Sequence, residues 1–184
     1  MSGVVLGLGS NRSYKGMSPL QVLTRACTML ESFLGELTVS GVYRTKAMYV
    51  TDQEDFYNAV VYGHFSGKPQ ELLVQIHKVE RELGRNRSRE FRNGPRSMDI
   101  DIEMFADVVM ESKRLVLPHP RMEERAFVLT PFLDVLQKCA DVNNKGTCFY
   151  EKRLSELSDQ GVEKLLSKEE FFSLYRQDAA KLKH

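Results

Sequence analysis

Two aspartates, Asp99 and Asp101, lie one residue apart in the apolar stretch SMDIDIEMF. Side chains of a strand alternate between its two faces, so these carboxylates and that of Glu103 share one face. Like charges at such short range repel each other unless a cation lies between them. Carboxylate oxygens without a neighbouring His or Cys suit Mg²⁺ better than Zn²⁺. The spacing predicts a magnesium site. The alternative is a solvent-facing strand whose acidic side chains point into water.

Arginines are concentrated between residues 81 and 96, just before the acidic pair. A guanidinium is a planar fork of donors that matches phosphate oxygens and keeps its charge. Such forks beside paired carboxylates are typical of phosphoryl transfer, although a solvated basic loop is the alternative. His119, between two prolines in LPHPR, is either structural or a phosphate contact. There is no GxxxxGK[ST] motif, so this is not a P-loop enzyme, and GLGSN by composition is only a turn. The arginines are Arg81, Arg85, Arg87, Arg89, Arg92 and Arg96.

The chain of 184 residues is long enough for one domain with a real core, since 42% of it is hydrophobic. A net charge of +1 argues against a polyanion as the main partner. Cys27, Cys139 and Cys148 are too far apart for a zinc ribbon and indicate free thiols in a reducing compartment. No signal peptide or membrane-spanning run is recognisable. We expect a cytoplasmic protein that is a monomer, with a dimer as the alternative.

Secondary-structure signals follow the order β-α-β-β-α-β. This order predicts an α+β fold of the ferredoxin-like kind, an antiparallel sheet with both helices on one face. Ser18-Pro19 and GKPQELL are helix starts, and Gly35 and Gly84 are helix ends. Strands are predicted over residues 4–8, 37–45, 55–66 and 98–105.

The remainder of the chain is predicted to add peripheral elements. Residues 111–118 form a short hairpin strand, and residues 122–136 are helical. Residues 151–184 are charged and amphipathic, which predicts one or two helices, the last near residues 168–182. We expect residues 1–150 to form the catalytic domain and residues 151–184 to be a C-terminal helical extension of that domain.

Five short motifs together resemble one family. They are GLGSN, VYRT followed by DQEDFYNAVV, VERELGR, RNGPRSMDIDI and LPHPRMEERAFVLTPFLDV, in that order from about residue 4 to residue 136. Together they resemble the 6-hydroxymethyl-7,8-dihydropterin pyrophosphokinases. The resemblance implies a ferredoxin-like fold and transfer of the pyrophosphoryl group of ATP to the hydroxymethyl group of a reduced pterin, giving AMP, in folate biosynthesis. It implies two Mg²⁺ ions as cofactors, and ATP and the pterin as partners, with no nucleic acid and no membrane.

The resemblance also implies roles for individual residues. The metal ligands would be Asp99 and Asp101, and the catalytic arginines Arg85 and Arg96. ATP would be bound by Glu80, Arg85, Arg87, Arg96, Ile102, His119 and Arg125. The pterin would be bound by Gly9, Thr45, Met48, Phe56, Asn58, Asp99 and Phe127, with Phe56 and Phe127 stacking on the ring, as flat heterocycles require.

Several positions depart from the family pattern. Lys46-Ala47 stands where prolines are frequent, and Asn93 stands where an aromatic residue is frequent, with Phe91 as its substitute. Glu103 replaces an aliphatic residue, and we expect it to face water rather than to add a third carboxylate. Residues 85–97, with their Gly-Pro pair, are predicted to close over ATP as a lid.

Three other functions fit parts of the sequence. Ferredoxin-like sheets also bind RNA, but here the aromatic RNA-binding motif is absent. A magnesium-dependent hydrolase or nucleotidyl transferase would share the acids and arginines but not Thr45, Phe56, Asn58 and Phe127. A non-catalytic homologue would not need both acids and both arginines, which are all present.

Overall fold

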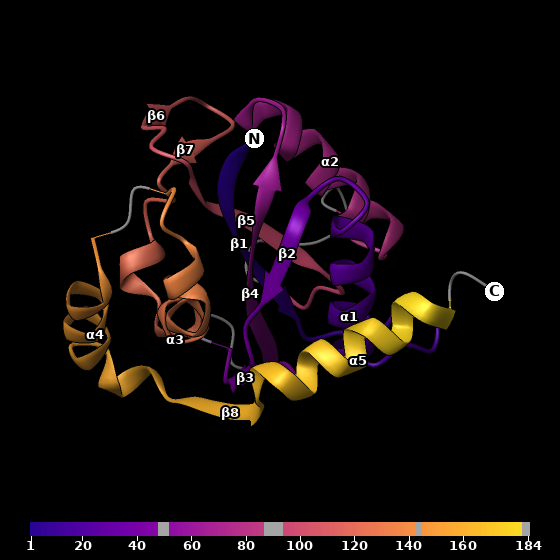
Figure 1. Cartoon of the computed structure of the whole chain (residues 1–184). Helices are drawn as coiled ribbons and strands as arrows, with labels where there is room; N and C mark the ends of the chain where they lie inside the picture. The colour runs from indigo at the N-terminus through magenta and orange to yellow at the C-terminus, as the bar shows by residue number, and fades with distance from the viewer. Residues whose placement is uncertain (48–51, 87–93, 143–144, 182–184) are drawn as a thin grey trace.

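The computed structural model describes residues 1–47, 52–86, 94–142 and 145–181 (Figure 1). The strands are β1 (Ser2–Ser10), β2 (Gly35–Val39), β3 (Val42–Thr45), β4 (Phe56–Phe65), β5 (Asp99–Phe105), β6 (Met110–Glu111), β7 (Val116–Leu117) and β8 (Val162–Leu166). The α-helices are α1 (Pro19–Leu30), α2 (Pro69–Glu82), α3 (Ala126–Val135), α4 (Thr147–Ser155) and α5 (Lys168–Lys181). Short 3₁₀ turns cover Met122–Glu124, Leu136–Lys138 and Ser158–Gln160.

An antiparallel sheet in the order β5-β1-β4-β3-β8 forms the centre of the molecule, and β2 also pairs with β4. The first seven elements, from β1 to β5, follow the predicted β-α-β-β-α-β order, with its second strand divided into β2 and β3. The predicted hairpin near residues 111–118 is confirmed as β6 and β7. The predicted ferredoxin-like arrangement is therefore confirmed.

Helices cover both faces of this sheet (Figure 1). The helices α1, α2 and α5 pack with alternate residues of β1, such as Val4, Leu6 and Leu8, in one hydrophobic core. On the other face, α3 and α4 form a second core around Phe132 and Tyr150. Most of the candidate residues on β1, β4 and β5 therefore lie on the α3 side of the sheet, beside this second core.

Local sequence explains where the two early helices begin. Ser18 accepts a hydrogen bond from the backbone N–H of Gln21, and the Gln21 side chain accepts one in return from Ser18 N–H. This reciprocal capping box satisfies two donors that a helix start would otherwise leave unpaired. Pro19 and Pro69 occupy the first helical positions, where proline is tolerated.

Three predicted elements differ from the structure. The strand predicted over residues 37–45 is interrupted at residues 40–41, and the helix predicted over residues 122–136 is interrupted at Arg125, whose backbone is extended. Residues 151–184 contain the predicted helix α5 but also β8, which sequence analysis missed. The boundary predicted between residues 150 and 151 falls inside α4. The division of the chain into a domain and a C-terminal extension stays a prediction.

No helix within the described residues is both long enough and apolar enough to span a membrane.

Candidate active site

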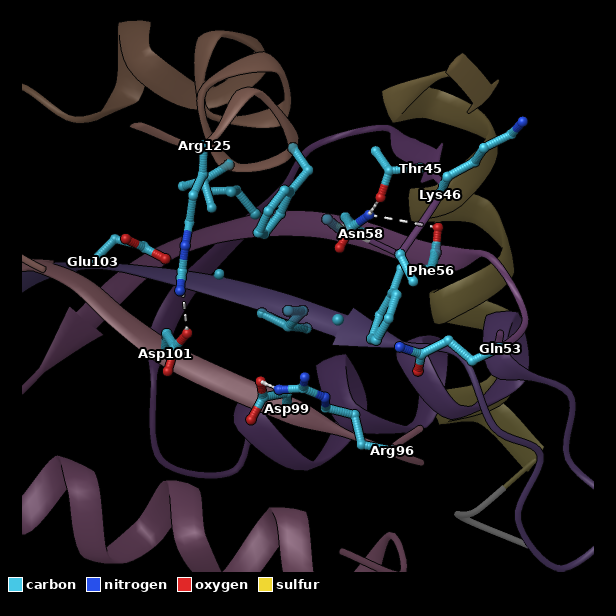
Figure 2. Close-up of a pocket in the computed structure, with 18 residues that line it drawn as sticks. Thr45, Lys46, Gln53, Phe56, Asn58, Arg96, Asp99, Asp101, Glu103 and Arg125 are labelled. Carbon is cyan, nitrogen blue, oxygen red and sulfur yellow. Dashed lines mark hydrogen bonds and ion pairs between the residues drawn. The ribbon is translucent and has the colours of Figure 1, made fainter. Parts of the chain in front are cut away.

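A pocket opens on the α3 side of the sheet, over β1, β4 and β5 (Figure 2). It gathers most of the residues that the sequence predicted to bind substrates. Its lining consists of Gly7, Leu8, Gly9, Thr45, Lys46, Ala47, Gln53, Phe56, Asn58, Ala59, Val60, Arg96, Asp99, Asp101, Glu103, Arg125, Phe127 and Val128.

Glycines of β1 form part of the floor of this pocket. Leu6 and Leu8 point into the core under α1, α2 and α5. Gly7 and Gly9 lie on the opposite face of the strand, where they present no side chain. A Cβ at Gly7 would lie 2.7 Å from Oε1 of Glu103, closer than real atoms approach. The Glu103 carboxylate takes up the space beside Gly7, whereas a Cβ at Gly9 would come no closer than 3.5 Å to another atom, so Gly9 leaves room above the strand.

The two aspartates of β5 are each paired with arginine. Arg96 donates to Oδ2 of Asp99, and Nη2 of Arg85 lies 3.6 Å from Oδ1 of the same carboxylate. Nη1 of Arg125 lies 3.5 Å from Oδ2 of Asp101 and reaches it from α3 (Figure 2). The side chains of all three arginines are largely buried, at 12–17% exposure. Guanidinium groups therefore compensate the charges of the adjacent carboxylates.

The GLGSN motif holds Arg96 in place. The Asn11 side chain accepts a hydrogen bond from Arg96 N–H, and Asn11 N–H donates to the Arg96 carbonyl, so the two residues bond reciprocally. Ser10 donates to the carbonyl of Ser97 at 2.6 Å. Asn11 also donates to Oε1 of Gln53, which lines the pocket. The motif that composition marked only as a turn therefore positions a predicted catalytic arginine, and Asn11 and Gln53 were missed.

Aromatic and amide side chains line the end of the pocket near β3. The buried Asn58 amide donates to Oγ1 of Thr45 at 2.9 Å. Phe56 and Phe127 come from β4 and α3, and the guanidinium groups of Arg96 and Arg125 lie 5.4 and 5.5 Å from their respective ring centroids. Rings with an amide and a hydroxyl nearby can stack on a heterocycle and hydrogen-bond its edge.

Glu103 does not face water, as the sequence analysis expected. It is 1% exposed and lines the pocket, and within the described residues neither carboxylate oxygen has a hydrogen-bond partner. The register of β1 against β5 shifts at this point: Val5 pairs with Met104, but the next residue, Leu6, pairs with Ile102, so Glu103 has no partner. This bulge leaves Glu103 unpaired and turns Met104 to the α3 face, where the sequence alternation had predicted the other face. Burial raises the pKa of Glu103 well above its ordinary value.

His119 lies beside Glu103. Its Nδ1 is 3.7 Å from Oε2 of Glu103 and accepts a hydrogen bond from Arg121 N–H. Burial lowers the pKa of His119, which favours the neutral ring. A neutral ring that accepts at Nδ1 carries its proton on Nε2, which makes Nε2 a donor.

Other predicted residues lie outside the pocket lining. Ile102 is buried in the core under α1, α2 and α5, on the face of the sheet opposite to the pocket. Glu80 is 1% exposed and accepts from the backbone N–H of Ile100 on β5, so it supports the strand that carries the aspartates. Arg85 reaches the site through Asp99, and a second cavity at the end of α2 includes both Glu80 and Arg85.

Some predictions lie outside the described residues. They concern Met48, Arg87, Arg89, Phe91, Arg92, Asn93 and most of the lid predicted over residues 85–97.

The donor set at β5 fits a magnesium ion that is held mostly by its substrate. Within the described ranges, no three side chains of His, Cys, Asp or Glu converge as a metal cage. Mg²⁺ commonly takes one or two carboxylates and completes its shell with water and substrate phosphates. Asp99 and Asp101 on one face of a strand match that pattern.

The model of the 7,8-dihydro-6-hydroxymethylpterin-pyrophosphokinase (HPPK) family matches residues 5–137. The chain belongs to the HPPK family. It is 41% identical over 135 residues to a 2-amino-4-hydroxy-6-hydroxymethyldihydropteridine pyrophosphokinase from Aquifex aeolicus (strain VF5), covering 73% of this chain and 81% of that protein. HPPK family members are ATP-using kinases, for which a magnesium requirement is general.

Similarity extends to longer relatives. The chain is 37% identical over 132 residues to the folic acid synthesis protein fol1 of Pneumocystis carinii, covering 72% of this chain but 17% of that protein. A crystal structure of Plasmodium falciparum HPPK-DHPS has a TM-score of 0.58 at 18% identity, covering 87% of this chain and 45% of that one. At that identity the structural likeness supports the fold alone.

Proposed function

We propose that the pocket described above is where ATP and the pterin meet. The phosphates would lie over Asp99 and Asp101, and the pterin would lie between Phe56 and Phe127. The observation that carries the proposal is the position of these two groups in one pocket, with arginines already paired to the acids.

The reaction follows from membership of the HPPK family. The enzyme transfers the pyrophosphoryl group of ATP to the hydroxymethyl group of 6-hydroxymethyl-7,8-dihydropterin, giving AMP and the pterin diphosphate in folate biosynthesis. The reaction depends on ATP and Mg²⁺.

The pterin end of the pocket would select its ligand by shape and hydrogen bonding. Phe56 and Phe127 would stack on the ring, and Gly9 would leave space beneath it. Asn58 and Thr45, which bond to each other in the ligand-free protein, would exchange part of that bond for the polar edge of the ring. Met48 completes the predicted set.

The phosphate end would work by charge. Arg85 and Arg96 are the proposed catalytic groups, because their forks can turn from Asp99 to phosphate oxygens and stabilise charge that develops during transfer. Two Mg²⁺ ions, held by Asp99 and Asp101, would supply further compensation of phosphate charge. Arg125 and the Nε2 donor of His119 are proposed to bind phosphates.

The remaining ATP contacts stay proposals. Glu80 and Ile102 have buried side chains, so Ile102 would contribute its backbone, and Glu80 would act at the edge of the second cavity. Arg87 completes the predicted set. A monomeric state and a cytoplasmic location also stay predictions.

Conservative replacement of the acids tests the site. We expect Asp99→Asn and Asp101→Asn each to lower pterin-dependent AMP formation by more than about a hundredfold, because amides cannot replace the lost charge. Asp107→Asn is the matched control, since Asp107 follows the same strand but is exposed and outside the pocket. Near-normal turnover in either site variant, with the control also active, would contradict the assignment.

A further inference from the structure

A C-terminal segment beyond the family match touches both walls of the pterin end of the pocket. The family model ends at residue 137, whereas this segment, which we call the C-terminal brace, runs from residue 160 to residue 166. It comprises the last residue of a 3₁₀ turn, Gly161 and β8. In Figure 1, β8 runs below α3 and reaches β3 before α5 begins. Its contacts are specific at both ends.

At its start, the brace caps α3. Oε1 of Gln160 accepts from the backbone N–H of Ala126 at 2.8 Å, and its Nε2 donates to the carbonyl of Glu124 at 2.8 Å. Arg125, the residue before the helix, provides no side-chain cap. The first N–H groups of a helix lack partners within the helix, so Gln160 supplies one from 34 residues away. This bond fixes the end of α3 that carries Arg125 and Phe127.

Further along, the brace forms a sheet edge with the strand that carries Thr45. Val162 pairs with Thr45, and Glu163 pairs with Arg44 in an antiparallel ladder. Nη2 of Arg44 lies 2.5 Å from the Glu163 carboxylate, although this pair is exposed and adds little stability. The ladder with β8 supports β3 on its outer side, while the pairing of β3 with β4 on its inner side brings the Thr45 hydroxyl to Asn58.

The end of the brace, Leu166, packs closely against Gly41. A Cβ there would lie 2.5 Å from the carbonyl oxygen of Leu166 and 3.2 Å from Oδ2 of Asp134, a residue of α3. Gly41 N–H and the Tyr43 hydroxyl both donate to that same Asp134 oxygen. The elements β3, β8 and α3 thus meet where only a glycine fits.

We propose that the C-terminal brace positions the two walls of the pterin pocket and thereby determines pterin affinity. The inference rests on the proposed function of that pocket. The brace holds Thr45 through β3 and Phe127 through α3, while Asp99 and Asp101 lie on β5 at the opposite edge of the sheet. The brace also adjoins Arg125, but the other proposed phosphate groups, Asp99 and Asp101, lie away from it, so loosening the brace weakens pterin binding more than it weakens binding of the nucleotide.

The test compares full-length Gln160→Ala and Gln160→Glu with the unmodified protein. The probes are 6-hydroxymethyl-7,8-dihydropterin, followed by its fluorescence in the presence of Mg²⁺ and a non-hydrolysable ATP analogue, and the analogue alone, followed by calorimetry. Gln160→Ala loses both hydrogen bonds of the Gln160 side chain, and we expect it to weaken pterin binding about five- to tenfold and analogue binding less than twofold. Gln160→Glu keeps the acceptor for Ala126 N–H but loses the donor to the Glu124 carbonyl, so its pterin affinity should lie between that of Gln160→Ala and that of the unmodified protein.

Asp178→Ala is the control for a merely structural role. Asp178 accepts two hydrogen bonds from Arg25 and so holds α5 against α1, away from the pocket. We expect this variant to lower the melting temperature and leave pterin affinity unchanged. The brace proposal is overturned if Gln160→Ala likewise leaves pterin affinity unchanged, or if Gln160→Glu binds the pterin no more tightly than Gln160→Ala does. Absence of pterin binding by the unmodified protein would instead refute the proposed function.

Discussion

Replacement of Glu103 by methionine is expected to stabilise the ligand-free protein. Glu103 is 1% exposed, both of its carboxylate oxygens lack hydrogen-bond partners among the described residues, and burial raises its pKa well above 4.5. Leaving a buried polar group unsatisfied costs about 1–3 kcal/mol. Methionine has a similar length without the polar atoms, so the free energy of unfolding should rise by about that amount. For a chain of this size the melting temperature should rise by roughly 3–10 °C.

The gain should depend on pH with a definite sign. An acid whose pKa is higher in the folded state binds more protons there than in the unfolded state, so it reduces stability as pH rises above its unfolded value. The advantage of Glu103→Met should therefore be smallest near pH 4 and larger at pH 7. Glu103→Gln is the control, because it cannot ionise but keeps buried polar atoms.

Urea unfolding at both pH values measures these differences. We expect Glu103→Met to exceed the unmodified protein at pH 7, with Glu103→Gln between them. A loss of stability in Glu103→Met at pH 7, or an equal gain at both pH values, would refute the reasoning that Glu103 is an uncompensated buried acid.

Two further predictions concern one arginine and the thiols. Arg96→Ala should lower kcat by about 10²–10³ while changing the affinity for ATP much less, because its fork acts on developing charge; steady-state kinetics that gave only a higher KM would make Arg96 a binding residue. One thiol, that of Cys148, should react with a thiol reagent in the native protein, since Cys148 is exposed whereas burial raises the pKa of Cys27 and that of Cys139, the latter to about 12. Mass spectrometry of the labelled chain would identify the modified residue, and fast labelling of Cys27 without denaturant would contradict the packing described.

Local signals predicted much of the fold. The Ser18-Pro19 cap and the short apolar strand over residues 4–8 depend on neighbours in the sequence alone. The placement of Asp99 and Asp101 on one face followed from strand periodicity in the same way. These features needed no knowledge of distant residues.

Other features depend on partners that are remote in the sequence. The bulge that buries Glu103 arises from the register of β5 against β1, which no pattern within β5 reveals. Formation of β8 requires β3 as its partner, more than 100 residues earlier, because a short charged strand has little preference of its own. The role of Asn11 likewise depends on a bond to Arg96 across 85 residues.

Pterin-dependent pyrophosphoryl transfer is tested most directly by analysis of the nucleotide products formed from ATP and Mg²⁺, with and without 6-hydroxymethyl-7,8-dihydropterin. AMP should form only when the pterin is present, in an amount equal to the pterin diphosphate formed. Formation of ADP, or of AMP regardless of the pterin, would contradict it, because the acids and arginines of the pocket would then serve a different phosphoryl reaction.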